Sequence, residues 1–334
     1  MQPERSTRES DRTLTKSSLL LQAESRNDGL ASLETLLNRT SELIEAGQVE
    51  PALEGLFVGL QDVRETNSST RWAELVADTC RRHPLQASLL QDPFTERCFL
   101  KPRGYAGDAV TLDYIYDGLR SVPNGTTELG RAIFKFTTSA LGSIAVRNRR
   151  SYVARLIAHT AQRTANPRVL SIACGHLREA ELSIALQSGR VSRLLALDQD
   201  PESLAAIDQC YGHWPVETLA FGVRDILRGR VELRGLDLVY TTGLFDYLTQ
   251  PVAKALTRRM LSMLGPGGEL LIANFRPGIL DAAYMESFMD WKLIYRSEDE
   301  MMDLVSDIPV EQVEDFSLSS DANESITFLR LTRT

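Results

Sequence analysis

The chain has 334 residues, of which 43% are hydrophobic and 25% charged, and its formal net charge is -8. This length allows one large domain or two smaller ones, and the composition is that of a globular protein rather than a disordered or fibrous one. The negative charge gives no general attraction to nucleic acid or to an anionic membrane surface, so neither is an expected partner.

Residues 1–16 are polar and lack the apolar core of a secretory signal, which predicts a disordered leader. No apolar run approaches the ~18 residues needed to cross a bilayer. The four cysteines are scattered and, with the four histidines, complete no metal-ligand spacing. We therefore expect a cytoplasmic protein with free thiols and no metal site.

Residues 17–164 are predicted to form an all-helical region, because apolar residues recur at intervals of three and four. It would serve as a cap over a binding site or as the interface of a homodimer. The basic run at 147–150 is interpreted as a solvated helix face.

One proline and two glycines interrupt this helical pattern in the loop Lys101–Asp108. As a lid, the loop would bring Tyr105 to a cofactor and Arg103 to a substrate carboxylate, which a guanidinium binds with two parallel hydrogen bonds. As a plain connector, it would only place Asp108 at the start of the next helix. The sequence leaves both interpretations open.

Residues 165–334 alternate between strand and helix patterns, which predicts a parallel sheet with helices on both faces. The strand candidates are residues 168–173, 193–198, 216–222, 236–242 and 269–275. Residues 310–333 give two further strand-like runs around a polar turn, which indicates an antiparallel hairpin. The predicted fold is a Rossmann-like, doubly wound α/β sheet of five parallel strands and a C-terminal hairpin, preceded by the helical cap.

The first strand–helix–strand unit carries the plan of an adenosine-binding site. A turn beginning at Ala173 follows the first strand, and Asp198 ends the second. Ala173 and Leu177 occupy two glycine places of a dinucleotide GxGxxG, and the Lys-Ser/Thr of a P-loop is missing. A cofactor without a pyrophosphate fits better, and S-adenosylmethionine (SAM) is the leading candidate.

Residues 168–334 resemble the class I SAM-dependent methyltransferases. VLSIACGHL stands where that family has a strand and a glycine-rich loop, LLALDQD resembles its ribose-binding segment, GVRDIL its adenine-side loop, and LGPGGELLIANF its fifth strand with the preceding tight turn. Ser171, Ala173 and Leu177 depart from the usual acid and two glycines. The RGYAGD and ACGxxRE segments are also loosely similar to bacterial methyltransferases that form hydroxy-fatty-acid methyl esters, which favours a small acceptor that carries a carboxylate.

The resemblance implies that Asp198 binds the ribose hydroxyls and that Asp225 contacts the adenine amino group. Asp200 is expected to cap a helix, which leaves Asp198 free for the ribose, whereas Asp225 could equally be a surface turn residue. Gly175 would allow a close backbone approach to the cofactor. The remaining expected cofactor contacts are Ala173, Cys174, Gln199, Ile226, Thr241 and Tyr105.

The loop after the fourth strand should face the transferable methyl group, because ligands of parallel sheets lie beyond the carboxyl ends of the strands. Asp246 and Tyr247 in this loop are candidate catalytic residues. His176 is a candidate general base, which only an amine or hydroxyl acceptor would need. Side chains that could wall the substrate pocket are Phe275, Arg276, Trp291 and Tyr295.

The predicted reaction is a direct in-line transfer of the methyl group to an O, S or N atom of a small molecule, for which the protein mainly supplies proximity and alignment. Two alternatives stay open. An aminopropyl transferase would use decarboxylated SAM and grip a polyamine with several acids. A regulatory or scaffold protein would bind SAM without turnover, which the substituted glycine loop supports.

Overall fold

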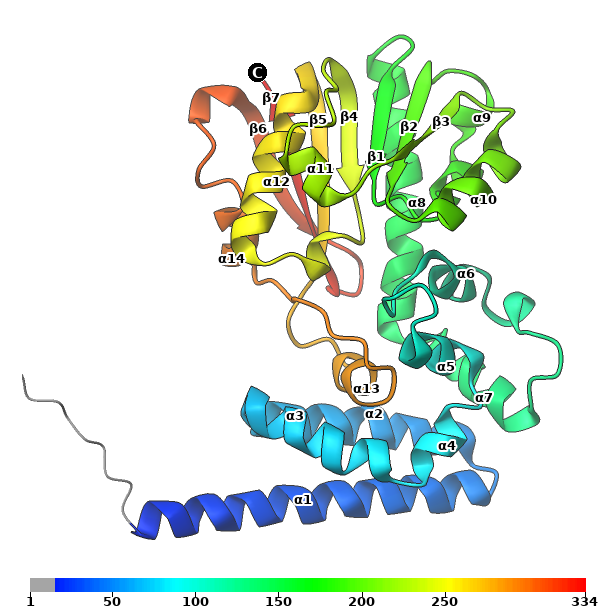
Figure 1. The fold of residues 1–334 in the computed structure, drawn as a ribbon, viewed down its shortest axis with the longest axis vertical. Coiled ribbons are helices and arrows are strands. Elements are labelled where there is room, and N and C mark those ends of the chain that lie inside the picture. Colours follow the sequence, from blue (N-terminus) through cyan, green and yellow to red (C-terminus); the bar gives the residue numbers. More distant parts are fainter. Residues whose placement is uncertain (1–15) are drawn as a thin grey trace, which may run out of the picture.

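A computed structural model describes residues 16–334 (Figure 1). The predicted leader lies outside these residues, apart from Lys16, with which the first helix begins. None of the described helices is long and apolar enough to cross a membrane.

The chain up to residue 163 is helical, as predicted. Its elements are α1 Lys16–Glu45, α2 Val49–Thr66, α3 Ser69–Asp78, η1 Cys80–Arg82, α4 Leu85–Leu89, α5 Pro93–Leu100, α6 Ala109–Asp117, η2 Gly118–Ser121, α7 Glu128–Thr137 and α8 Leu141–Arg163. The last of these, α8, runs from the cap helices up to the sheet and joins the two parts of the molecule (Figure 1).

A seven-stranded sheet follows in the order β3-β2-β1-β4-β5-β7-β6. The strands are β1 Arg168–Ile172, β2 Arg193–Asp198, β3 Val216–Ala220, β4 Leu236–Thr241, β5 Leu264–Phe275, β6 Val313–Ser320 and β7 Ile326–Arg333. The first five are parallel, and β7 is antiparallel to both β5 and β6. The predicted α/β sheet of five parallel strands with a C-terminal hairpin is confirmed.

Helices cover both faces of the sheet, which explains why its strands read as continuous apolar runs. On β1, Val169 packs in one core cluster with α8, α9 and α10, whereas Leu170 packs in a second cluster with α11, α12 and α14. The elements that follow β1 are η3 Arg178–Leu182, α9 Ile184–Gln187, α10 Pro201–Tyr211, α11 Val223–Leu227, η4 Phe245–Tyr247, α12 Gln250–Met263, α13 Ala282–Phe288, α14 Glu298–Asp303 and η5 Val310–Gln312.

Two local predictions need correction. The single helix expected between the first two strands is broken into η3 and α9, because Ser183 has extended backbone angles and its side chain caps α9. The expected turn Gly265–Gly268 is a bulge within β5. Leu236 pairs with Leu264 and Leu238 pairs with Glu269, so β5 advances five residues where β4 advances two. A Cβ on Gly268 would come within 2.6 Å of the Leu236 carbonyl oxygen, so this close approach requires glycine.

The cap also draws on the C-terminal part of the chain. Helix α13, from the segment between β5 and β6, packs against α2 and α3 (Figure 1). Its Glu286 accepts two hydrogen bonds from Arg64, 2.9 and 3.0 Å long, and one of 2.7 Å from the indole of Trp72. A division of the chain into two domains at residue 164 therefore stays a prediction.

Candidate active site

A cavity of about 660 Å³ lies at the carboxyl ends of β1, β2 and β4, beneath the cap. Its size falls in the range of about 300–1,000 Å³ that is usual for small-molecule and cofactor sites. The strand order reverses between β1 and β4, so the cavity lies at the topological switch point where ligands of doubly wound sheets bind.

Asp198 lines this cavity from the end of β2 and is only 6% exposed. The backbone N–H groups of Gly175 and Asp200 donate to its two carboxylate oxygens, at 2.8 and 3.0 Å. Burial raises the pKa of Asp198, and these hydrogen bonds oppose the rise. Each oxygen keeps a lone pair for a further donor, such as a ribose hydroxyl. Asp200 instead caps α10, as expected.

The loop after β1 keeps a glycine-type backbone although two of its residues are not glycine. Ala173, Gly175 and Leu177 have φ angles of 53°, 53° and 52°. Each non-glycine residue in this left-handed region carries a strain of about 1 kcal/mol. The departures from the family pattern therefore leave the backbone of the loop in a glycine-like conformation.

His176 lines neither this cavity nor the chamber described below. Its Nδ1 lies 2.8 Å from a carboxylate oxygen of Asp113 on α6, and its Nε2 is buried without a partner among the described residues. The imidazole thus joins the loop to the cap, and the role of His176 as a general base stays a prediction.

The loop Lys101–Asp108 agrees with the connector interpretation and with only part of the lid interpretation. Tyr105 and Arg103 line the cavity, but the guanidinium of Arg103 is already bonded to Asp200, Glu202 and Ser203. It is therefore not free for a substrate carboxylate. Asp108 caps α6, as the connector interpretation expects.

The other predicted cofactor residues divide into two groups. Four of them line the cavity, namely Ala173, Cys174, Gly175 and Gln199. Three others do not line it, namely Thr241, Asp225 and Ile226. Asp225 caps the first turn of α11 and pairs with Arg230 at 2.9 Å, while Ile226 is fully buried in the core. Thr242 and Gly243 line the cavity in place of Thr241.

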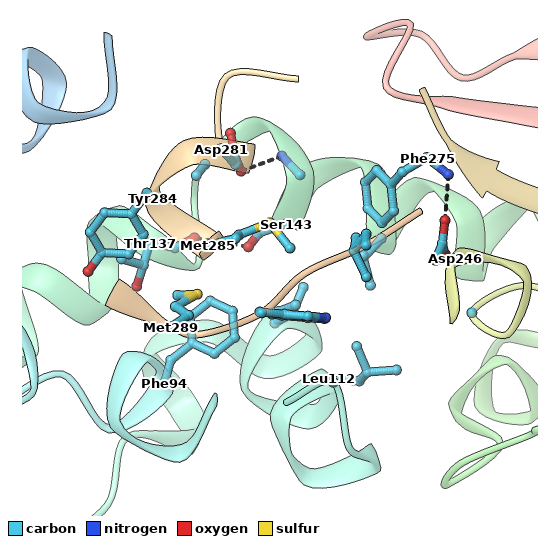
Figure 2. A pocket seen from close by; sticks show the side chains of 18 of the residues that line it. Phe94, Leu112, Thr137, Ser143, Asp246, Phe275, Asp281, Tyr284, Met285 and Met289 are labelled. Carbon is cyan, nitrogen blue, oxygen red and sulfur yellow. Dashed lines mark hydrogen bonds between the residues drawn. The ribbon is translucent and has the colours of Figure 1, made fainter. Parts of the chain in front are cut away.

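A second, narrower chamber of about 50 Å³ adjoins the cavity. Figure 2 shows side chains that line this chamber. Five residues line both the cavity and the chamber, and we call this shared set the neck: Gly107, Leu112, Arg149, Gly243 and Tyr247. Beyond the neck, most of the chamber wall is apolar. The side chains come from cap helices, from β5 and from α13, and they include Phe57, Phe94, Phe275, Tyr284, Met285, Met289 and Trp291.

Two buried carboxyl groups stand on the chamber wall (Figure 2). Asp246 accepts a hydrogen bond of 2.8 Å from the backbone of Phe275, and Asp281 accepts one of 2.7 Å from the backbone of Gly142. Burial raises the pKa of each carboxyl to about 6. A group with such a pKa can exchange a proton near neutral pH.

Of the four predicted wall residues, the structure places two at the chamber. Phe275 and Trp291 line it, and the indole of Trp291 donates a hydrogen bond of 2.7 Å to the hydroxyl of Tyr247. Arg276 is bonded to Ser320 instead, and Tyr295 packs beneath the guanidinium of Arg64.

The sequence analysis missed two charged residues that line the cavity, Arg149 and Glu179. Arg149 was assigned to a solvated helix face, yet it is 4% exposed. It follows Val146 by three residues and precedes Val153 by four, which places it on the buried face of α8. The spacing of Arg149 from these buried valines is the sequence feature that could have identified it as a buried residue.

Among the described residues, no cluster of His, Cys, Asp and Glu could hold a metal.

Residues 103–201 match the sequence profile of a family described as "Putative methyltransferase". The matched stretch contains most of the lid loop, α6 to α8, the loop after β1 and Asp198. It confirms the predicted resemblance to methyltransferases, whereas the narrower resemblance to enzymes that form hydroxy-fatty-acid methyl esters stays a prediction. No curated protein matches the chain in sequence.

Several solved structures are similar in fold. A possible exported protein from Bordetella parapertussis is 16% identical, with a TM-score of 0.58 over 80% of this chain and 98% of that one. The N-methyltransferase NodS from Bradyrhizobium japonicum, in complex with S-adenosyl-L-homocysteine, is 17% identical, with a TM-score of 0.42 over 66% and 99%. The magnesium protoporphyrin IX methyltransferase from Synechocystis, with bound SAM, is 13% identical, with a TM-score of 0.42 over 67% and 96%.

Proposed function

We propose that this chain, which combines the expected class I methyltransferase sheet with a match to a methyltransferase family, transfers the methyl group of SAM to a small acceptor. One observation carries the proposal. A cavity with Asp198 on its wall adjoins a mainly apolar chamber, and the two share five lining residues. Two adjoining spaces of this kind suit a cofactor and an acceptor that must meet at one point.

The residues on the cavity wall fit an adenosine-bearing cofactor. Asp198 offers carboxylate oxygens to ribose hydroxyls, and charge-assisted hydrogen bonds of this kind are the stronger ones. Gly175 gives the loop a close backbone approach, and Tyr105 closes the cavity from the cap side. When bound, SAM supplies a methyl group on an electrophilic sulfonium. The protein orients the reactants at the neck and excludes water.

The acceptor is assigned to the chamber beyond the neck. Because the chamber holds only about 50 Å³, a drug-sized acceptor requires its wall to move, and Met285 and Met289 on that wall are flexible side chains that can do so. A carboxylate on the acceptor stays a prediction, because the guanidinium of Arg103, which was expected to bind it, is engaged by Asp200. For a hydroxyl or amine acceptor, Asp246 is the candidate base, because its pKa of about 6 suits proton removal near neutral pH.

The chamber carboxyls favour a second candidate function. Asp246 and Asp281 could hold a cationic amine, as an aminopropyl transferase that uses decarboxylated SAM would require. A regulatory protein that binds SAM without turnover is the third alternative. The homodimer, the lack of a nucleic-acid partner and the cytoplasmic location stay predictions.

Calorimetric titration with S-adenosylhomocysteine tests the cofactor site. The variant Asp198→Asn should bind at least about tenfold more weakly than wild type, because a charged hydrogen-bond acceptor is lost. Asp225→Asn is the matched control, since Asp225 was also predicted to bind the cofactor but does not line the cavity. A folded wild type that binds neither S-adenosylhomocysteine nor SAM would overturn the proposed function.

Transfer of radioactive methyl groups from SAM to carboxylate, thioether, hydroxyl and amine compounds then separates the alternatives. Transfer to any of them would exclude the regulatory protein. Aminopropyl transfer from decarboxylated SAM, with no methyl transfer from SAM, would support the second candidate instead.

A further inference from the structure

Arg149 is a buried cation for which the described residues provide neither a hydrogen bond nor an ion pair. Its helix neighbours are engaged: Arg147 donates to the carbonyl oxygens of Ile115 and Thr138, and Arg150 donates to the carbonyl oxygen of Arg178. Because an unpaired buried charge is costly, buried guanidinium groups are normally paired with an anion. Arg149 lines the cavity, so its missing partner can be supplied by a ligand.

Glu179 lines the same cavity and carries the opposite charge. One of its carboxylate oxygens accepts a hydrogen bond of 2.7 Å from the hydroxyl of Tyr240, which fixes the side chain. Burial raises the pKa of Glu179, and the nearby charges of Arg150 and Arg149 oppose the rise. No ion pair joins Glu179 to Arg149 among the described contacts. The two side chains therefore present opposite charges to one cavity without neutralising each other.

The position of this pair relative to Asp198 fits an elongated ligand. Asp198 ends β2, whereas Arg149 lies beside the loop after β4, with a guanidinium nitrogen 3.7 Å from where a Cβ would stand on Gly243. Strand β1 separates β2 from β4 in the sheet, so the two sites are about 10 Å apart across two strand spacings. A ligand with a ribose at one end and charged groups at the other would span this distance.

We propose that Arg149 and Glu179 bind the amino-acid end of the cofactor, Arg149 its carboxylate and Glu179 its ammonium group, and that Arg149 makes the protein select SAM over decarboxylated SAM. This inference rests on the proposed function and deepens it. A carboxylate-free cofactor would leave Arg149 unpaired, so the geometry disfavours aminopropyl transfer. Arg149 is here a specificity-determining residue of the cofactor site.

Calorimetric titration with four ligands tests the roles of Arg149 and Glu179. SAM and S-adenosylhomocysteine have both charged groups, decarboxylated SAM has only the ammonium group on its chain, and 5′-methylthioadenosine has neither. Wild type should bind S-adenosylhomocysteine at least about tenfold more tightly than 5′-methylthioadenosine, as expected for a charge-assisted pair. Arg149→Gln should remove most of this preference and the preference for SAM over decarboxylated SAM, while its affinity for 5′-methylthioadenosine stays unchanged.

Two further variants sharpen the result. Glu179→Gln should weaken SAM and decarboxylated SAM by the same factor, because both carry the ammonium group. Arg155→Gln is the matched control, since Arg155 lies on the same helix but is exposed. If Arg149→Gln does not fold, Arg149→Lys replaces it and should show a smaller loss of the same preference.

The inference is overturned if substitution of Arg149 leaves the preference for S-adenosylhomocysteine over 5′-methylthioadenosine unchanged. It is also overturned if that substitution weakens both ligands equally. A wild type that binds none of the four ligands would overturn the proposed function as well. A wild type that binds all four equally would overturn only this inference.

Discussion

Asp113 on α6 and Arg178 after the cofactor loop form a two-bond ion pair, in which Nε and a terminal nitrogen of the guanidinium each donate at 2.8 Å. His176 adds a third contact of 2.8 Å to the same carboxylate. Burial alone would raise the pKa of Asp113, but the bonds from Arg178 and His176 outweigh it and hold that pKa below its usual value. One cap residue therefore fixes the loop that contains Gly175.

We expect Asp113→Asn to lower the free energy of unfolding by about 2 kcal/mol, because two charged donors lose their ionised acceptor. Affinity for S-adenosylhomocysteine should also fall, because the loop loses its attachment to the cap. The stability difference should shrink below about pH 4, since a carboxyl with a depressed folded-state pKa loses its stabilising effect as pH falls through that value.

Urea unfolding and calorimetry measure both effects. Asp117→Asn is the control, because Asp117 ends the same helix and its ion-pair partner is the exposed Arg120. An Asp113→Asn protein with wild-type stability and affinity would show that the ion pair does not hold the loop.

The sheet could be predicted from the sequence because its strands are buried on both faces and leave unbroken apolar runs. The position of Asp198 on the cavity wall could be predicted because the end of a strand and the spacing from the preceding turn define it locally. Arg149 could not be assigned from the run of charges alone. A run of charged residues indicates a solvent-exposed helix face, whereas the spacing of Arg149 from the apolar residues of α8 indicates the buried face. The partners of Arg103 lie about a hundred residues away in the chain, so only the fold shows that this side chain is engaged.

The neck between the cavity and the chamber is packed closely around Gly107. A Cβ at this position would come within 2.5 Å of the Tyr247 hydroxyl and within 2.6 Å of the Trp291 ring. Gly107→Ala should therefore destabilise the protein by about 1–3 kcal/mol, which is the usual effect of overpacking a filled site. It should also break the hydrogen bond between the two aromatic side chains.

Gly55→Ala is the matched control with the opposite expected sign. A Cβ on Gly55 would meet nothing within 4 Å, and the residue lies inside α2, so alanine should stabilise the protein by up to about 1 kcal/mol. Thermal unfolding of both variants makes the comparison. If Gly107→Ala is as stable as wild type, the neck can widen and the close packing does not limit passage to the chamber.

The buried carboxyl of Asp281 predicts a pH-dependent loss of stability. Its pKa is raised by burial to about 6 in the folded protein, against about 3.9 in an unfolded chain. A carboxyl with a raised folded-state pKa destabilises the fold once it ionises, so this effect is absent below about pH 4 and complete above about pH 6. The stability of Asp281→Asn relative to wild type should therefore increase by about 1 kcal/mol between about pH 5 and about pH 7.5.

Urea unfolding at both pH values measures this difference in stability. Asp315→Asn on the exposed strand β6 is a control that should show no such change. A relative stability that stays constant or falls with pH would mean that a positive charge compensates the ionised Asp281 in the chamber wall.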